Sequence, residues 1–359
     1  MLVNSVSKIP LTLTLTLTLT LTLTLKMDLS TLLRFMLNPD SYPIKPEKVQ
    51  MLQTHISYLF TAGEYVYKVK KPVNFGFLNY STLEKRRFYC EQEIKLNSRL
   101  SPEIYLGISQ INLDKGVFSL DGKGEVKEYA VKMKNLPQDR MMNRMIANKM
   151  VNKAVIREIA DKLVKFHRYA EVNNEICKYG DIKIIFKNIN ENFLQTERYI
   201  GTNISIKEYN LIKKNSFKFI EENEAVFKKR IDEKRIRDCH GDLRTEHICL
   251  SDRIYIFDCI EFSDRLRYGD VASEVAFLAM DMDFSYENEL SRYFVDSYIK
   301  LANDNDINKV INFYKCYRAY VRGKVESFKL NDPDIQSKDK EKSLDLAKRH
   351  FKLAASYVS

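Results

Sequence analysis

Two aspartates separated by a short β-like segment are the residues of this sequence best suited to chemistry. Asp242 follows a His-Gly pair, and Asp258 comes directly after the segment Ile248 to Phe257. That segment has β-rich residues on both sides of a Ser-Asp-Arg turn, which predicts a hairpin that brings Asp258 back to face Asp242. Phosphoryl transfer needs such a pair, because one carboxylate orients the attacking hydroxyl and accepts its proton while the other holds magnesium on the phosphates.

Each aspartate also has a structural interpretation. Taken alone, Asp242 would be a residue that caps a turn, and Asp258 would be a residue that ends a strand. The two together, at the separation of a hairpin and with His-Gly before the first, favour the catalytic interpretation. We therefore expect Asp242 to be the catalytic base and Asp258 to be a metal ligand.

The segments that precede residue 135 are mostly β-like. Ile56 to Phe60 and Tyr65 to Val69 are β-rich runs on either side of an Ala-Gly-Glu turn, and together they predict a hairpin. Further strands are expected over residues 105–113, 117–120 and 129–133.

A helix is expected between these groups of strands. Ser81 and Glu84 form a capping box, in which the serine caps the helix and the glutamate reaches back. Leu83, Cys90 and Ile94 then fall on one helical face, which predicts that this face packs on the strands.

Beyond a Leu-Pro break at residues 136–137 the pattern is mostly helical. Apolar residues recur at helical spacing at Val155, Ile159, Leu163 and Phe166. Further helices are expected over residues 206–237, 273–280 and 307–328. The sum predicts an α+β protein with a small N-terminal β lobe that carries one helix, residues 27–135, and a larger, mainly helical C-terminal lobe, residues 136–359.

The first 26 residues differ from the rest. Leu11 to Leu25 is a strict Leu-Thr alternation. This run is too polar for a transmembrane helix and is a poor secretory signal. A dipeptide repeat of this regularity suggests translated simple-sequence DNA, so we expect residues 1–26 to lie outside the fold and Met27 to be the biological start. No other segment is apolar enough to span a membrane, so we expect no membrane partner.

Composition narrows the class of protein further. The chain has 359 residues and a net charge of +10. Its fractions of hydrophobic residues, 45%, and charged residues, 30%, are typical of a globular protein. The basic residues are spread along the chain and interrupted by acidic ones. This pattern lacks the clustered basic and aromatic residues of a nucleic-acid-binding protein, so no nucleic-acid partner is expected.

The six cysteines form no CxxC pair. Cys239, Cys249 and Cys259 recur at equal spacing, but this spacing departs from known zinc patterns and each lies in an apolar context. Buried structural thiols explain them better than a zinc site. Scattered unpaired cysteines are typical of a reducing compartment, so a cytoplasmic location is expected.

Several further runs, taken with the Asp242 and Asp258 segments, resemble an uncharacterised bacterial branch of the aminoglycoside phosphotransferase family, which has the protein-kinase-like fold. The similarity extends in order over roughly residues 29–330, so it matches in context as well as in motif. The runs that carry it are residues 54–57, 66–68, 77–86, 96–100, 257–262 and 317–325.

The resemblance implies roles for residues near the two aspartates. Asp242 matches the catalytic base, and Asp258 matches the magnesium-binding aspartate. Five residues after the base the family usually has an asparagine that is a second metal ligand, and this chain has His247. Imidazole suits magnesium poorly, so three roles stay open for His247: a metal ligand, a phosphate contact or a packed side chain.

The resemblance also implies a nucleotide site. Lys68 matches the lysine that contacts the α- and β-phosphates, Glu93 matches its ion-pair partner, and the segment around Met133 matches the hinge whose backbone meets adenine. Lys70 lies on the same strand face as Lys68, so it is an alternative for the phosphate contact. The usual glycine-rich phosphate loop is absent, and hydroxyls and backbone amides of residues 54–57 would have to replace it.

The sequence therefore predicts an enzyme that uses ATP and Mg2+ to phosphorylate a hydroxyl of a small molecule, with Asp242 as base. Two alternatives remain: a protein kinase, which is disfavoured because no Ala-Pro-Glu follows Asp258, and a non-catalytic nucleotide-binding or scaffold protein of the same fold. His167 is expected to be a packed side chain. Arg318, Arg322 and Lys324 are expected to lie on a solvated helix face, and contact with an anionic substrate is the alternative for them. Neither the acceptor nor the oligomeric state can be read from the sequence.

Overall fold

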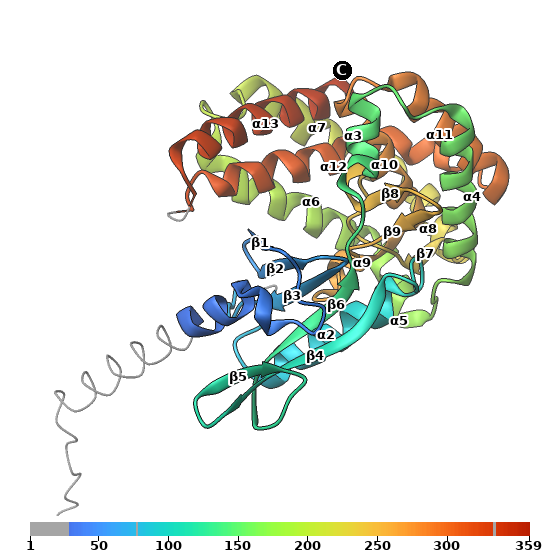
Figure 1. Cartoon of the computed structure of the whole chain (residues 1–359). Helices are drawn as coiled ribbons and strands as arrows, with labels where there is room; N and C mark the ends of the chain where they lie inside the picture. Colours follow the sequence, from blue (N-terminus) through green and yellow to red (C-terminus); the bar gives the residue numbers. More distant parts are fainter. Residues whose placement is uncertain (1–28, 77, 333–334) are drawn as a thin grey trace, which may run out of the picture. The chain divides into compact units, whose positions relative to one another are not determined.

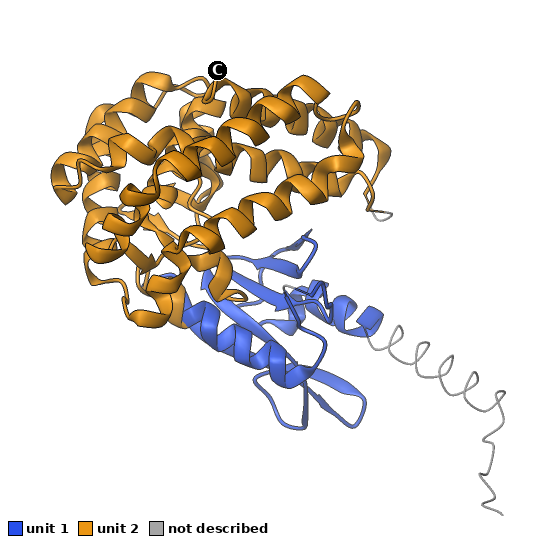
Figure 2. Cartoon of the chain, turned by 180° about the vertical axis from the view of Figure 1, so that it is seen from behind, with its two compact units in different colours: residues 1–94, 103–135 blue, residues 95–102, 136–359 orange. Residues whose placement is uncertain are grey.

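The computed structural model of the chain describes residues 29–76, 78–332 and 335–359 (Figure 1). The expectations for the Leu-Thr run and for a start at Met27 lie outside these residues. The chain divides into two compact units, each with its own core (Figure 2). Unit 1 comprises Met1–Ile94 and Glu103–Asn135, and unit 2 comprises Lys95–Pro102 and Leu136–Ser359.

The described part of unit 1 is built on a six-stranded antiparallel sheet with the strand order β1-β2-β3-β6-β4-β5. The predicted strands are confirmed, and β6 is longer than expected because it pairs along much of β4. The strands are β1 Val49–Gln53, β2 Ser57–Ala62, β3 Tyr65–Lys70, β4 Tyr105–Asp114, β5 Val117–Leu120 and β6 Glu125–Lys134.

The predicted hairpin between β2 and β3 is also present. Ala62 pairs with Tyr65 across the turn, and Gly63 has a φ of 59°. A left-handed backbone is least costly for glycine, so the short Ala-Gly-Glu turn can close without strain.

The helix α2, Leu83–Asn97, starts one residue later than its predicted cap implies. The hydroxyl of Thr82, not Ser81, accepts a hydrogen bond from the backbone N–H of Lys85 at 3.3 Å. The hydroxyl of Ser81 instead donates to the Asn79 side chain at 2.7 Å. Both residues are good caps, so the local pattern could not fix which one closes the helix.

The buried face of α2 also differs from the expected one. Arg86, Cys90, Glu93 and Asn97 are buried, whereas Leu83 and Ile94 are only partly buried. Three of these four residues are polar or charged, so an apolar pattern could not reveal the face. Arg86 is satisfied by Glu128 of β6, with two hydrogen bonds at 2.8 and 2.9 Å from its Nε.

The core of unit 1 lies between the sheet and the helical residues 29–37. Leu32 and Met36 from this helical segment pack with Phe60 of β2 and Tyr67 of β3. Tyr42 joins them and packs on Tyr67 with ring centroids 5.1 Å apart. The segment before the first strand therefore completes the small core.

Unit 2 is mainly helical, as expected. The predicted helices at 155–166, 273–280 and 307–328 and the hairpin at 248–257 are all present. The expected single helix over 206–237 is wrong: it breaks at Asn223, and its last residues form the strand β7. The helices are α3 Met142–Ala147, α4 Lys153–Tyr169, α5 Asn174–Cys177, α6 Ile182–Thr196, α7 Ile206–Glu222, α8 Glu224–Asp232, α9 Asp264–Arg267, α10 Val271–Phe284, α11 Asn288–Ala302, α12 Ile307–Lys329 and α13 Ser337–Ser356.

Two short antiparallel ribbons lie among these helices. The strand β7, Ile236–Asp238, pairs with β10, Tyr268–Asp270. The strand β8, Ile248–Leu250, pairs with β9, Ile254–Ile256. Figure 1 shows both ribbons against the helices of unit 2. The ribbons matter for function because the two predicted catalytic aspartates follow β7 and β9.

The helix α10 forms the centre of the unit 2 core, with nearly all its residues buried. It packs against α11 and α12, and α12 packs in turn against α13. Gly323 of α12 allows this last contact, because a Cβ there would lie 2.8 Å from the ring of Phe351. Within the described residues, no helix combines the length and apolar character that crossing a membrane requires.

The buried Arg86–Glu128 pair gives a stability prediction. Burial raises the pKa of Glu128 even with Arg86 beside it, so the site solvates this carboxylate poorly. We expect Arg86→Ala to lower the free energy of unfolding by roughly 3–5 kcal/mol, since it leaves a buried charge without its partner. Chemical denaturation would measure the loss.

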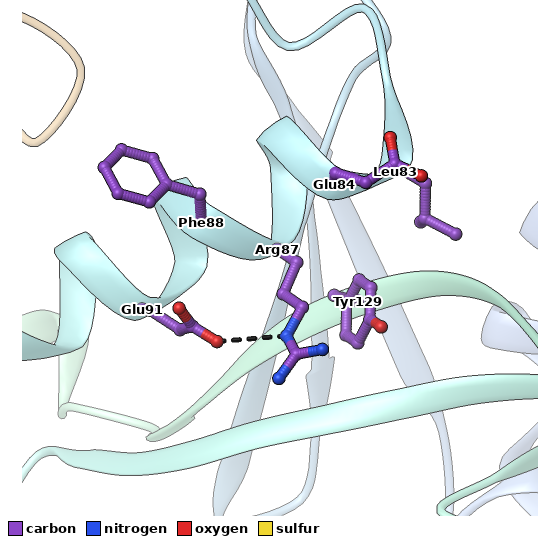
Figure 3. A pocket seen from close by; sticks show the side chains of 6 residues that line it. All are labelled: Leu83, Glu84, Arg87, Phe88, Glu91 and Tyr129. Atoms are coloured by element: carbon purple, nitrogen blue, oxygen red, sulfur yellow. Dashed lines mark hydrogen bonds and ion pairs between the residues drawn. The ribbon is translucent and has the colours of Figure 1, made fainter.

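The neighbouring Arg87 provides a matched control. It forms an exposed ion pair with Glu91 beside Phe88 and Tyr129, in an open hollow of about 220 Å3 (Figure 3). We expect Arg87→Ala to change the free energy of unfolding far less than Arg86→Ala, because solvent screens exposed ion pairs. Equal losses for the two variants would contradict the assignment of Arg86 as a structural ion pair.

Candidate active site

The candidate nucleotide residues of unit 1 form a three-membered ion pair. Glu93 of α2 accepts from Lys68 Nζ through Oε1 at 2.8 Å and from Lys70 Nζ through Oε2 at 2.6 Å. The period of two along β3 puts both lysines on one face, as the sequence predicts. The carboxylate therefore holds both candidate lysines, and the ion pair alone does not choose between them.

The surroundings of the two lysines differ. The side chain of Lys70 is 0% exposed, and its ammonium lies 4.9 Å from the centre of the Tyr80 ring. The side chain of Lys68 keeps 10% of its surface exposed. Lys68 is thus the member of the pair that solvent, and any ligand that takes the place of solvent, can reach.

The segment Thr54–Ser57 forms a tight turn before β2. The Thr54 hydroxyl accepts from the backbone N–H of Ile56 at 3.3 Å and of Ser57 at 3.0 Å, and the Thr54 N–H donates to the Ser57 carbonyl at 2.9 Å. These groups are the ones expected to replace a glycine-rich phosphate loop. The Thr54 hydroxyl and the amides of Thr54, Ile56 and Ser57 are already used within the turn, and the Ser57 hydroxyl is buried, which weakens that expectation.

Met133 lies near the end of β6. It pairs with Val66 of β3 on one side and with Tyr105 of β4 on the other. The following Asn135 closes the strand by donating its backbone N–H to the Glu64 carbonyl at 2.8 Å. The predicted hinge segment is therefore an ordered strand end, and Met133 itself is partly buried.

In unit 2 a short strand leads into the loop that carries Asp242. The loop follows β7 rather than the predicted helix, and it turns at Gly241, which has a φ of 87°. A Cβ on Gly241 would lie 3.0 Å from the Leu266 carbonyl oxygen. Both the left-handed backbone and the close approach require glycine here.

Three hydrogen bonds join the Asp242 loop to the segment around Asp258, and a fourth, within the loop, orients the His240 ring. The Phe257 N–H donates to the His247 carbonyl at 3.1 Å, and the Ile260 N–H donates to the His240 carbonyl at 3.0 Å. The His240 ring donates from Nε2 to the Phe257 carbonyl at 2.9 Å and accepts from the Asp242 N–H at 3.3 Å. The β8–β9 hairpin thus returns the chain beside the first aspartate.

His247 lies between the two aspartates. Its Nδ1 is 3.7 Å from Asp242 Oδ2, and its Nε2 is 3.6 Å from Asp258 Oδ2. Asp258 is 43% exposed and has a φ of 62°, a left-handed conformation that is uncommon outside glycine. Strained backbone at an exposed carboxylate is typical of functional sites.

Asp242 is held by a guanidinium that the sequence analysis did not single out. Arg244 Nε and Nη2 donate to the two carboxylate oxygens of Asp242, each at 2.9 Å. Burial works to raise the pKa of Asp242, but Arg244, followed by His247 and Arg322, outweighs it and lowers the pKa well below the usual value of an aspartate. Asp242 is therefore ionised under all ordinary conditions.

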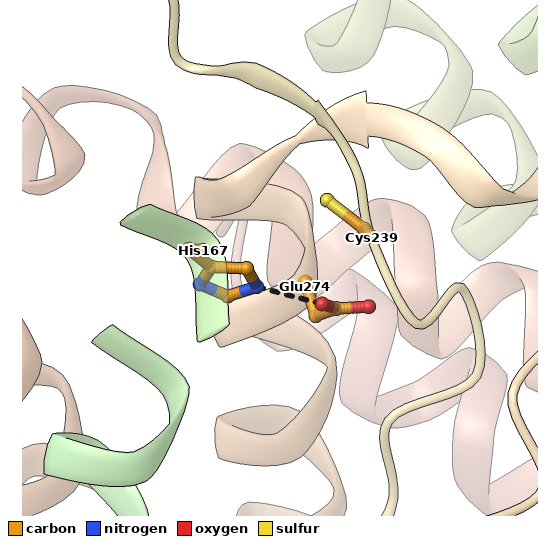
Figure 4. A group of neighbouring side chains, drawn as sticks. All are labelled: His167, Cys239 and Glu274. Atoms are coloured by element: carbon orange, nitrogen blue, oxygen red, sulfur yellow. Dashed lines mark hydrogen bonds and ion pairs between the residues drawn. The ribbon is translucent and has the colours of Figure 1, made fainter. Parts of the chain in front are cut away.

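The backbone before Asp242 is anchored to Glu274 of α10, whose carboxylate lies beside His167 and near Cys239 (Figure 4). Glu274 accepts from the N–H of His240 at 2.8 Å and of Gly241 at 2.7 Å. His167 of α4 approaches the same carboxylate through Nε2 at 2.7 Å, and Tyr298 approaches the His167 Nδ1 at 2.7 Å. Because a carboxylate only accepts, His167 donates to Glu274 from Nε2.

Comparison with known proteins adds two findings. No family model matches the chain. Uncharacterized proteins of Mycobacterium tuberculosis (strain ATCC 25618 / H37Rv) and Mycobacterium bovis (strain ATCC BAA-935 / AF2122/97) are each 30% identical to it over 321 residues, which is 89% of this chain and 62% of each relative. The chain thus spans less than two thirds of the length of these curated relatives.

Solved structures decide the fold. A choline/ethanolamine kinase family protein from Mesorhizobium loti superposes with a TM-score of 0.51 at 11% identity, over 90% of this chain and 97% of that one. The chain has a protein-kinase-like fold. Aminoglycoside 2'-phosphotransferase-IIIa, solved as its GDP complex, has a TM-score of 0.49 at 12% identity, over 89% of this chain and 98% of that one.

Within this protein-kinase-like fold, the segment Lys95–Pro102 braces both aspartate segments. Arg99 donates to the backbone carbonyls of Asp238 and Cys239, each at 3.0 Å. Asn97 accepts from the Cys259 N–H at 2.8 Å. The residues that position Asp242 and Asp258 thus come from a segment some 140–160 residues earlier in the sequence.

Five of the six cysteines of the kinase-like fold are buried thiols, and Cys177 is partly buried. Cys239 and Cys259 have pKa values raised by burial, that of Cys259 to about 12. Cys239 lies near His167 and Glu274 in a group that has metal-ligand types. Three N–H donors already occupy the Glu274 carboxylate, so hydrogen bonding accounts for this group without a metal.

The Glu274 anchor predicts a pH dependence of stability. Burial works to raise the pKa of Glu274, but His167 and the loop amides hold it at about 2. A carboxylate whose pKa is lower in the folded than in the unfolded state stabilises the fold at pH values above its unfolded-state pKa. This stabilisation is lost as the pH falls toward 2. At pH 5 we expect wild type to be more stable than Glu274→Gln. This difference in the free energy of unfolding should shrink by roughly 3 kcal/mol between pH 5 and pH 2.

Urea titrations at several pH values would measure this gap. Glu175→Gln, at an exposed site on α5, is the matched control and should follow wild type throughout. A gap for Glu274→Gln that stays constant with pH would show that the carboxylate charge is not what anchors the loop.

Proposed function

We propose that the chain is a phosphotransferase of the aminoglycoside phosphotransferase family that transfers the γ-phosphate of ATP to a hydroxyl of a small molecule. The observation that supports this most is the linked pair of loops in unit 2. They hold two carboxylates on opposite sides of His247, with each carboxylate within 4 Å of that ring. Such a pair is what phosphoryl transfer requires of the protein.

Asp242 acts as the base in this proposal. The acceptor oxygen attacks the γ-phosphorus, the bond from phosphorus to the β,γ-bridging oxygen breaks, ADP leaves, and the hydroxyl proton passes to Asp242. The low pKa of Asp242 keeps the carboxylate ionised and ready to accept a hydrogen bond from the hydroxyl. Because the transition state is loose, orienting the hydroxyl contributes more than strong basicity.

Asp258 binds the divalent cation in this proposal. An exposed carboxylate is a ligand that Mg2+ favours, so the donor type fits. The bound ion supplies positive charge that neutralises the phosphates. For His247 the arrangement favours the roles other than direct ligation, because its Nε2 faces Arg244 at 3.4 Å.

Lys68 contacts the phosphates of ATP in this proposal, with Glu93 holding its ammonium in place. Lys70 pairs with the same carboxylate and is fully buried, so its role in this proposal is to stabilise the fold. The backbone around Met133 meets the adenine. These three assignments rest on the resemblance and on the greater exposure of Lys68.

A non-catalytic nucleotide-binding protein is the second candidate, and the Thr54–Ser57 turn favours it. The turn uses its own hydroxyl and amides internally, which leaves fewer groups for the phosphates than a glycine-rich loop provides. One experiment separates the two candidates: a pool of metabolites is incubated with γ-labelled ATP and magnesium. Transfer of label to a small molecule supports the enzyme, whereas nucleotide binding with no turnover supports the second candidate.

Asp242→Asn tests the base. The amide keeps the shape of the side chain but cannot take the proton, so we expect turnover to fall by about 10²–10⁴ while ATP affinity stays within a few-fold. Asp252→Asn, in the exposed β8–β9 turn, is the control and should keep full turnover. Unchanged turnover per folded Asp242→Asn molecule would exclude Asp242 as the base.

The two lysines should separate by readout. We expect Lys68→Ala to raise the KM for ATP by an order of magnitude or more, because a phosphate contact is lost. Lys70→Ala should mainly lower the melting temperature, since it empties a fully buried site. Steady-state kinetics and thermal unfolding of both variants measure this, and the reverse pattern would transfer the phosphate contact to Lys70.

A further inference from the structure

Arg244 occupies the place in the Asp242 loop where a second metal ion would be expected. The resemblance puts a second metal ligand at position 247, and at that position the guanidinium of Arg244 lies among the carboxylates of Asp242, Glu246 and Asp258. We propose that Arg244 supplies a fixed positive charge beside Asp242, so that this chain binds its nucleotide with one divalent cation, on Asp258, and not with two. This inference rests on the proposed function.

The first observation is the set of anionic partners that already hold Arg244. Its guanidinium donates to both oxygens of Asp242 at 2.9 Å and also pairs with Glu246. The Arg244 side chain is only 9% exposed. A guanidinium cannot lose its proton in a protein, so this charge stays in place at every working pH.

The second observation is how His247 is used. Its Nδ1 lies 2.8 Å from the backbone carbonyl oxygen of Asp242, which only accepts, so the ring proton is on Nδ1. The other ring nitrogen, Nε2, lies 3.4 Å from Arg244 Nη2. A metal ion on Nε2 would have to displace the guanidinium from two carboxylates at once.

The spacing of the remaining donors agrees with this. His247 Nε2 and Asp258 Oδ2 are 3.6 Å apart. Neighbouring ligands of an octahedral magnesium ion, at bond lengths of about 2.1 Å, lie roughly 3 Å apart. His247 Nε2 and Asp258 Oδ2 are therefore farther apart than neighbouring ligands in such a site, and the Arg244 guanidinium lies beside Nε2.

Other positive charges face the same loop from α12. Arg318 donates from Nη1 to the Gly241 carbonyl at 3.4 Å and from Nε to Ser273 at 3.0 Å. Arg322, which pairs with Glu326, is among the charges that act on Asp242. A second divalent cation near Asp242 would meet repulsion from these groups as well as from Arg244.

The test counts metal ions directly. Protein in excess over the ATP analogue AMP-PNP is titrated with Mn2+, and free Mn2+ is measured by electron paramagnetic resonance. We expect one Mn2+ per bound nucleotide for wild type. The double variant Arg244→Ala/His247→Asn removes the guanidinium and restores an amide ligand, so it should bind two.

Each result bears on the proposal. Two Mn2+ per nucleotide in wild type would overturn it and leave the phosphotransferase function intact, and this count does not depend on any variant folding. A double variant that is folded but still binds one ion would remove Arg244 as the cause and also overturn it. Failure of wild type to bind the nucleotide with any metal would instead overturn the proposed function. Arg157→Ala, on the exposed face of α4, is the control and should bind one ion.

Discussion

The Asp242 loop depends above all on the N–H groups that converge on the buried carboxylate of Glu274. Two of them are backbone amides of the loop, and the third is the ring N–H of His167. An ionised carboxylate in a protein interior is costly unless donors surround it, so the loop amides and Glu274 stabilise one another. This mutual requirement fixes the backbone immediately before Asp242, and accurate position is what phosphoryl transfer would demand of Asp242 in the role of base proposed above.

Further contacts within unit 2 hold the Asp258 segment in place against the Asp242 loop. The His240 ring bridges the Asp242 N–H and the Phe257 carbonyl, so movement of one loop would break contacts of the other. The segment Lys95–Pro102 adds a second support, because Ser101 both donates to and accepts from the Ile256 backbone, at 2.8 and 2.9 Å. Rigid support of this kind allows one residue, Asp258, to keep a left-handed backbone that it would not adopt on its own.

Sequence periodicity predicted much of the fold, because β-rich runs predicted β2 and β3 and the apolar stripe predicted α4. It failed where polar residues are buried: the inner face of α2 carries Arg86 and Glu93, which no apolar pattern reveals. The strand β7 was missed for a similar reason, since a strand of three residues is too short to show a period.

The candidate site divides in the same way. Asp242 and Asp258 stand out because they lie at a hairpin's separation along the chain. Glu274 and Arg99 contact the same loop from distant positions, and a sequence pattern within one segment cannot show such contacts. Arg244 is close to Asp242 in sequence, and the signal that could have found it is simple: an arginine two residues after a candidate base, in a loop, can reach back to it.

In the proposed function, the contact between Arg244 and Asp242 has two opposite effects on Asp242 as the base. Positive charge lowers the pKa of Asp242, which makes it a weaker acceptor of a full proton. The bidentate geometry, however, fixes the plane of the carboxylate, and each oxygen keeps a second lone pair for the acceptor hydroxyl. In a loose transition state the nucleophile loses little of its proton before the phosphorus moves, so a fixed lone pair counts for more than basicity. The guanidinium that weakens Asp242 as a base thus strengthens it as a guide for the attacking oxygen.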